Sequence, residues 1–227
     1  MSQRDQDIYI SAPLRSLLAQ ETVVLAPGLQ RCAGSHALLL SVAREDVPPV
    51  LPLLGNWTRL NMAAGGYGGD VRAHGDEALP FLDDAFDLVL MRHALEVSSA
   101  PQALLEEATR VLAPGGVLAL TGLHPFSAWM PWMLWRMRGH GLAVHSPILL
   151  ERWVRRFELD IERVERVGAL WPGGRVGLDA SHAFGGGYVL IARKRRRIAT
   201  PIRLKSKPVP APVSVGLAPG ARRNTAS

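Results

Sequence analysis

A strand, a helix and a second strand follow one another between residues 87 and 121, and this order constrains the fold most. The runs Asp87–Met91 and Val117–Thr121 are short and largely apolar, as in strands buried on both faces of a parallel sheet. Between them, apolar residues recur at helical spacing from Leu104 to Leu112, and Pro114-Gly115-Gly116 ends that pattern. A βαβ unit of this kind predicts an α/β fold with a parallel sheet.

Other segments extend this pattern in both directions. Further strands are predicted at His36–Ala43, Trp57–Met62, Leu159–Ala169 and Gly187–Ala192, and helices are predicted to begin near Ser11 and Ser146. The run Gly65–Gly69 is interpreted as a flexible turn, because neither a clear buried strand precedes it nor a helical pattern follows it. Contact with a phosphate or a cofactor is the alternative.

The charge of the chain is concentrated at its C-terminal end. The 227 residues include 48% hydrophobic residues, enough for the core of one domain, and carry a formal charge of +6. Ten of the 26 Lys and Arg lie from Arg193 onward, where no acid occurs, so the preceding residues hold 16 bases against 20 acids. We therefore expect an N-terminal segment at 1–32 that covers the sheet, a domain at 33–195, and a disordered basic tail rich in Pro and Ala at 196–227.

The basic residues between 193 and 223 predict contact with nucleic acid or another anionic surface, with a merely solubilising tail as the alternative. A single cysteine, Cys32, excludes an internal disulfide and indicates a reducing compartment, so we expect a cytoplasmic protein. The sequence contains no stretch that predicts a transmembrane segment. No pair among the seven histidines has convincing metal-ligand spacing, and no metal is predicted.

One long segment carries a resemblance to a known family. The stretch Asp76-Glu-Ala-Leu-Pro-Phe-Leu-Asp-Asp-Ala-Phe-Asp-Leu-Val-Leu-Met-Arg-His-Ala-Leu-Glu96, followed by Leu105-Glu-Glu-Ala-Thr-Arg-Val-Leu-Ala-Pro-Gly-Gly116, resembles the central half of small class I S-adenosylmethionine (SAM) methyltransferases of the type 11-like group. The chain looks most like a proteobacterial branch with a basic C-terminal tail. The resemblance implies a three-layer Rossmann-like methyltransferase fold with a mostly parallel seven-stranded sheet and an antiparallel last strand.

The resemblance also implies SAM as the cofactor and places its site at the carboxyl ends of the strands. The predicted cofactor-binding residues are Ser41, Val42, Ala43, Asn61, Asp76, Glu77, Ala78, Met91 and Arg92. Asp76 is predicted to accept a hydrogen bond from the adenine amino group, with the amide of Glu77 or Ala78 serving a ring nitrogen.

Two features depart from the family pattern. The turn Ser41–Asp46 lacks the glycines that let a backbone approach the cofactor closely. The acid that grips the ribose after the second strand is missing, with Asn61 or a neighbour in its place. Two interpretations stay open: a SAM-dependent methyltransferase acting on a small, partly apolar acceptor, or a noncatalytic, methyltransferase-like binding protein whose tail contacts nucleic acid or a partner.

Three residue types are candidates for chemistry beyond the cofactor. His93 and His124 follow two neighbouring strands and are the predicted catalytic bases, with buried structural histidines as the alternative. Glu96 is interpreted as a surface acid at a helix end, with a substrate contact as the alternative. Trp129 and Trp132, in a segment rich in Trp and Met, are predicted to cover a substrate pocket, to pack into the core, or to contact a membrane or another protein.

Overall fold

The computed structural model describes residues 8–63, 66–74, 78–136, 143–174 and 184–196. These residues all belong to one compact unit, Met1–Arg197. Apart from Arg196, the predicted basic tail lies outside the described residues, so its predicted disorder and its partner stay predictions.

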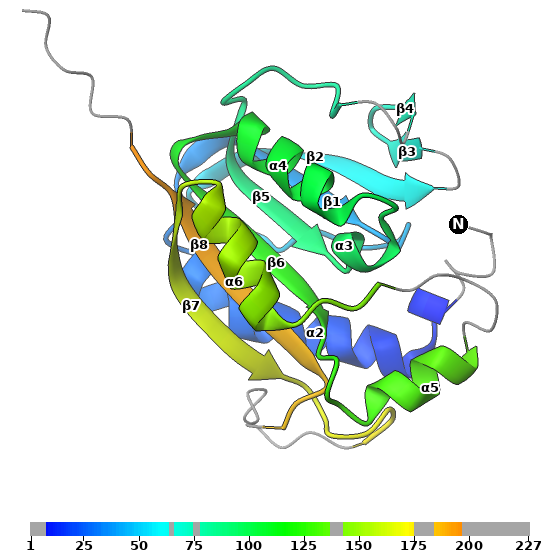
Figure 1. Ribbon diagram of the computed structural model, residues 1–227. Helices are drawn as coiled ribbons and strands as arrows, with labels where there is room; N and C mark the ends of the chain where they lie inside the picture. Colours follow the sequence, from blue (N-terminus) through cyan, green and yellow to red (C-terminus); the bar gives the residue numbers. More distant parts are fainter. Residues whose placement is uncertain (1–7, 64–65, 75–77, 137–142, 175–183, 197–227) are drawn as a thin grey trace, which may run out of the picture. The chain divides into compact units, whose positions relative to one another are not determined.

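The unit is built on an eight-stranded sheet with the order β4-β3-β2-β1-β5-β6-β8-β7 (Figure 1). The strands are β1 (Gly34–Ser41), β2 (Leu54–Ala63), β3 (Gly66–Gly69), β4 (Ala73–His74), β5 (Phe86–Arg92), β6 (Leu112–Leu123), β7 (Leu159–Val167) and β8 (Gly187–Lys194). The four central strands β2, β1, β5 and β6 are parallel, and the outer strands pair antiparallel. The predicted Rossmann-like architecture with an antiparallel last strand is confirmed, and the sheet has eight strands where seven were predicted.

Helices cover both faces of the sheet. They are α2 (Ala12–Leu29), α3 (Ala94–Val97), α4 (Pro101–Val111), α5 (Trp129–Arg136) and α6 (Pro147–Arg156). In Figure 1, α4 and α6 lie in front of the sheet and α2 lies behind it. The predicted start of α6 is confirmed, since the Ser146 side chain accepts a hydrogen bond from the N–H of Leu149 and Pro147 opens the first turn.

A second hydrophobic cluster, behind the sheet, explains the position of α2. Its members include Val24, Leu25 and Leu29 of α2 together with Leu39, Leu88, Leu90, Val117, Val189 and Ile191 of the sheet. A larger hydrophobic cluster lies in front of the sheet. Along β1, β5, β6 and β8, side chains that belong to the cluster behind the sheet alternate with side chains that belong to this larger cluster. Both faces of the central strands are therefore buried, which accounts for their continuous apolar sequences.

The connection between β1 and β2 contains no helix. Residues 42–53 run as irregular turns, although parallel strands are usually joined by a helical crossover. Pro48, Pro49 and Pro52 remove backbone donors and prevent a helix here. Leu51 is buried in the hydrophobic cluster behind the sheet, so a side chain of this connection covers the sheet where a crossover helix usually would.

The prediction of a flexible turn at Gly65–Gly69 is wrong for Gly66–Gly69, which forms β3. This strand pairs antiparallel with β2, so its backbone groups are satisfied by a regular ladder. Gly69 has a φ of 121°, and a Cβ there would lie 2.4 Å from the carbonyl oxygen of Arg59, so this position requires glycine.

Candidate functional site

A row of polar residues crosses the carboxyl ends of the central strands. The register aligns Arg92 of β5 with Ser41 of β1. Ser41 in turn lies beside Asn61 of β2, and Asn61 lies opposite Gly68 of β3. The strand order reverses between β1 and β5, because the chain leaves β1 for β2 on one side and later reaches β5 on the other. Ligands of open α/β sheets bind at such a point, so this row marks the candidate site.

The turn after β1 is held by a serine and an aspartate rather than by glycines. Ser41 Oγ donates to Asp46 Oδ2 at 2.7 Å and accepts the backbone N–H of Ala43 at 3.3 Å. Ser41, Val42 and Ala43 are all buried. Hydrogen bonds made by side chains therefore define this turn. Of these three residues, Ala43 lines a pocket.

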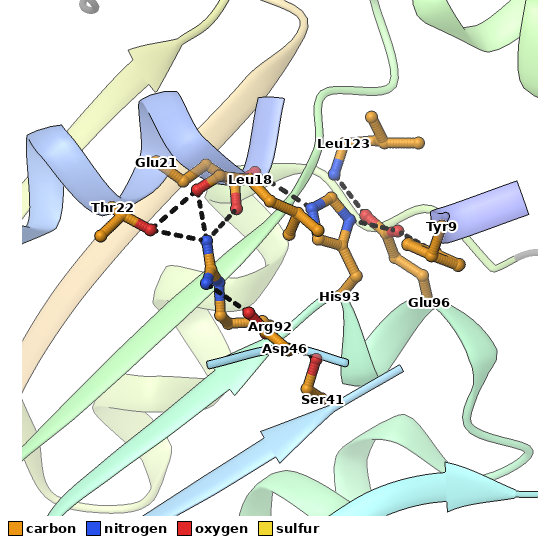
Figure 2. A network of polar contacts seen from close by, with 10 residues as sticks. All are labelled: Tyr9, Leu18, Glu21, Thr22, Ser41, Asp46, Arg92, His93, Glu96 and Leu123. Atoms are coloured by element: carbon orange, nitrogen blue, oxygen red, sulfur yellow. Dashed lines mark hydrogen bonds and ion pairs between the residues drawn. The ribbon is translucent and has the colours of Figure 1, made fainter. Parts of the chain in front are cut away.

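Arg92 is buried and connects the turn after β1 to α2 (Figure 2). Its Nη1 lies 2.8 Å from Asp46 Oδ1, and its Nη2 donates to Thr22 Oγ1 at 3.0 Å and to the carbonyl of Leu18. Glu21 Oε2 lies 3.9 Å from Nη2. The Nε of Arg92 is buried with no hydrogen-bond partner among the described residues, so one donor of this guanidinium is unused.

His93 is enclosed by two carboxylates. Its Nε2 lies 3.0 Å from Glu21 Oε1 and its Nδ1 lies 3.0 Å from Glu96 Oε2 (Figure 2). Burial lowers the pKa of His93, but the carboxylates of Glu21 and Glu96 outweigh burial and raise this pKa from 6.5 to about 10. His93 is therefore an imidazolium at neutral pH, and both of its ring nitrogens already donate hydrogen bonds.

The interpretation of Glu96 as a surface acid is wrong. Its carboxylate is buried and accepts hydrogen bonds from Tyr9 Oη at 3.2 Å and from the backbone N–H of Leu123. Tyr188 lies near it, and burial followed by the charges of Glu96 and Glu21 raises the pKa of this phenol well above 10. Tyr9 and Leu123 are distant in sequence from Glu96, so no local pattern could have revealed this environment.

Two pockets open beside the polar row. The first has a volume of about 290 Å³ and is lined by Tyr9, Ile10, Arg15, Leu18, Ala19, Thr22, Ala43, Glu45, Asp46, Val47 and Arg92. The second has a volume of about 440 Å³ and is lined by Arg44, Asn61, Tyr67, Gly68, Gly69 and Arg72. Ala43 and Arg44 are consecutive, so the two pockets lie on either side of the turn that follows β1.

The remaining predicted cofactor residues are distributed differently. Asn61 lines the second pocket. Met91 is buried in the core in front of the sheet, because it alternates with Arg92 along β5. Ala78 is exposed. Asp76 and Glu77 lie outside the described residues, so the adenine contact stays a prediction.

His124 lies past the end of β6 and is half-buried. Burial, and then the charge of Arg166, lower its pKa, so the ring is neutral near pH 7. Its Nδ1 accepts the backbone N–H of Phe126 at 3.2 Å, which assigns the ring proton to Nε2. Neither His93 nor His124 lines the two pockets, and neither presents a free ring lone pair in the described part of the site.

The two predicted substrate tryptophans pack against each other on α5. Trp129 is only 2% exposed, and its Nε1 donates to the carbonyl of Ala169 at 2.9 Å. The Trp132 ring meets Trp129 edge to face at 5.9 Å. This packing holds α5 against the loop after β7, so Trp129 belongs to the core, while a role in substrate binding stays a prediction.

The first bases of the C-terminal run form part of the domain. The ion pairs are Arg193 with Glu162 at 2.5 Å, Lys194 with Asp84 at 2.8 Å and Arg195 with Asp160 at 2.9 Å. These three side chains are therefore engaged within the unit.

None of the described helices has the length and apolar character that crossing a bilayer requires. The described residues also contain no group of three or more His, Cys, Asp or Glu suited to a metal ion.

Comparison with known proteins identifies the fold. The sequence model of a family described as "Methyltransferase domain" matches residues 58–120. A SAM-dependent methyltransferase from Thermotoga maritima superposes with a TM-score of 0.57 over 85% of this chain and 96% of its own, at 14% identity. The chain has the fold of the class I SAM-dependent methyltransferases.

Two further solved structures with this methyltransferase fold are similar. A SAM-dependent methyltransferase from Archaeoglobus fulgidus matches with a TM-score of 0.54 over 79% of this chain and 96% of its own, at 14% identity. A SAM-dependent methyltransferase from Aquifex aeolicus matches with a TM-score of 0.52 over 85% of this chain and 98% of its own, at 14% identity. No curated protein matches the chain in sequence.

The match to the family begins in β2 and ends in β6, so β1 and the turn after it lie outside the segment that follows the methyltransferase pattern.

Proposed function

We propose that the chain is a SAM-dependent methyltransferase whose cofactor enters the 290 Å³ pocket at the carboxyl ends of β1 and β5. The observation that carries this proposal is the buried, unused Nε donor of Arg92 at the point where the strand order of a methyltransferase fold reverses. A buried donor without a partner is costly, and a ligand acceptor would satisfy it.

The donors and acceptors around this pocket match the charges of SAM. The methionine part of SAM carries a carboxylate, an ammonium and a sulfonium. Arg15 and Arg92 supply guanidinium donors for the carboxylate, and Glu45 and Asp46 supply negative charge for the two cations. Leu18 and Val47 supply apolar wall. The residues that line the pocket therefore fit the cofactor.

When bound, SAM supplies an electrophilic methyl group on a sulfonium. The contribution of the chain is to hold the reactants in line and to exclude water, which raises the effective concentration of the acceptor at the methyl carbon. A small, partly apolar acceptor stays our prediction for the substrate. Because neither His93 nor His124 offers a free lone pair, we favour an acceptor that loses its proton without help from these two residues.

The test is isothermal titration of the full chain with SAM and S-adenosylhomocysteine. Arg15 and Ala19 lie on exposed positions of α2 and line the pocket, so their variants leave the core intact. Arg15→Ala should weaken binding about tenfold, which corresponds to about 1.4 kcal/mol. Ala19→Leu should weaken binding by filling the pocket, and Asp76→Ala tests the predicted adenine contact.

Arg31→Ala is the matched control, because Arg31 is exposed just beyond the C-terminal end of α2 and lines neither pocket. It should bind SAM as the unmodified chain does. Absence of SAM binding to the folded chain at millimolar ligand would reject the proposal and favour the noncatalytic alternative.

A further inference from the structure

The second pocket, at the carboxyl end of β2, has a different chemistry from the first. Its described lining contains two guanidinium groups, Arg44 and Arg72, the amide of Asn61 and the glycine backbone of β3, but no acidic side chain. We propose that this pocket binds a phosphate group. The proposal goes beyond the proposed function and does not rest on it, because SAM carries no phosphate. It assigns Asn61, which the sequence predicted as a cofactor residue, to the phosphate instead.

The two arginines have no competing partner among the described residues. Neither Arg44 nor Arg72 forms an ion pair there. Other arginines at the ends and edges of the sheet do form ion pairs, namely Arg59, Arg92, Arg163, Arg193 and Arg195. Asp70 lies next to Gly69, but its carboxylate accepts from the backbone N–H of Arg59 at 2.8 Å and lies 3.5 Å from the Arg59 side chain. Two guanidinium groups around one pocket repel each other until an anion lies between them.

The pairing of β2 with β3 supplies the space for such an anion. Asn61 lies directly opposite Gly68 in the antiparallel ladder, so the two positions share one face of the sheet. A Cβ built on Gly68 meets no atom within 4 Å. The missing side chain therefore leaves room beside the Asn61 amide, which can donate two hydrogen bonds.

Charge and geometry favour phosphate over other anions. A phosphate monoester carries a charge of about −1.5 to −2 at pH 7 and three strong acceptor oxygens, which matches two arginines and an amide. Guanidinium groups bind phosphate oxygens in bidentate pairs. In nucleotide-binding α/β folds, an acid after the second strand binds a ribose hydroxyl, and an arginine there accommodates a ribose phosphate instead. This chain has Asn61 at that position, and Arg44 after β1 and Arg72 after β3 line the same pocket.

The experiment titrates the full chain with inorganic phosphate, adenosine 2′-monophosphate and adenosine by isothermal calorimetry at low ionic strength. We expect saturable one-site binding of the two phosphate-containing ligands and none of adenosine. Binding of the nucleotide at least tenfold tighter than inorganic phosphate would identify a nucleotide phosphate as the source, and equal affinity would identify free phosphate.

Three variants locate the site. Arg44→Ala/Arg72→Ala should weaken phosphate binding at least tenfold. Gly68→Leu should weaken it as well, because the new side chain fills the pocket while both bases remain, and its Cβ meets no atom within 4 Å. Arg31→Ala is the control and should leave the affinity unchanged.

The bases beyond residue 196 also attract phosphate, and the variants separate that contribution. Phosphate binding that persists in Arg44→Ala/Arg72→Ala, or its absence from the unmodified chain, would overturn the proposal. A parallel titration with SAM keeps the two proposals distinct. Phosphate binding without SAM binding would reject the proposed function alone, and SAM binding without phosphate binding would reject this inference alone.

Discussion

His93 Nε2 lies 3.0 Å from Oε1 of Glu21, and this contact joins the end of β5 to the middle of α2. The opposite ring nitrogen lies 3.0 Å from Glu96, so the imidazolium is held between two buried carboxylates. Separating either carboxylate from the ring would leave a buried charge without its partner. The position of α2 over the strand ends therefore depends on the protonation of one histidine.

This arrangement predicts that the chain loses stability as the pH rises above neutrality. The pKa of His93 is about 10 in the folded state against 6.5 for the free group, so its stabilisation is complete below pH 6.5 and decreases as the pH rises toward 10. Melting temperatures measured between pH 7 and 8.5 should fall with pH. This range lies below the ordinary pKa of Cys32, 9.0, which burial raises further.

His93→Gln should remove this pH dependence and lower the stability at pH 7 by about 3–5 kcal/mol, the usual cost of breaking a buried ion pair. His36→Gln, at an exposed position on β1, should keep the pH dependence of the unmodified chain. Equal slopes for the unmodified chain and His93→Gln would show that His93 is not the titrating group.

A second prediction compares a buried ion pair with an exposed one. Asp46 and Arg92 are both less than 10% exposed and lie 2.8 Å apart, whereas Asp70 and Arg59 are about half exposed and lie 3.5 Å apart. Asp46→Asn should reduce the free energy of unfolding by about 3–5 kcal/mol. Asp70→Asn should reduce it by less than about 1 kcal/mol. Urea denaturation of both variants gives the comparison, and similar losses would contradict it.

The central sheet could be predicted from sequence because its strands are buried on both faces and therefore read as continuous apolar runs. The helix α6 could be predicted because Ser146 and Pro147 form a local start signal. The strand β3 could not, since glycines have no side-chain periodicity and the pairing partner, β2, is needed to see the ladder. The burial of Glu96 could not be predicted either, because its partners, Tyr9 and Leu123, come from distant segments.

The site residues also divide into those that could be predicted from sequence and those that could not. Ser41, Asn61 and Arg92 could be placed at strand ends, because strand ends can be read from apolar runs, and the strand register aligns these residues. The approach of Glu21 and Thr22 to Arg92 could not be predicted. Their approach depends on how α2 packs across the sheet, which is a tertiary property.

A third prediction concerns the space around Glu96. A Cβ on Gly122 would lie 2.5 Å from Tyr188 Oη and 2.7 Å from Glu96 Oε1, two buried side chains with little freedom to move. Gly122→Ala should therefore destabilise the chain by about 1–3 kcal/mol. Gly68→Ala is the matched control in the same sheet, because its Cβ meets no atom within 4 Å. Thermal denaturation of the two variants is the measurement, and an equal effect of both would contradict the crowding around Gly122.

The last prediction separates core packing from ligand contact on α5. Trp129 is buried and hydrogen-bonded to Ala169, whereas Leu134 on the same helix is 60% exposed. Trp129→Ala should lower the free energy of unfolding by about 3–5 kcal/mol, because it leaves a cavity and an unpaired carbonyl. Leu134→Ala should change it by less than about 0.5 kcal/mol. Urea denaturation measures both, and SAM titration of the same proteins shows whether α5 contributes to the ligand site. A Trp129→Ala variant that keeps its stability and loses only ligand binding would instead establish α5 as a cover of the substrate pocket.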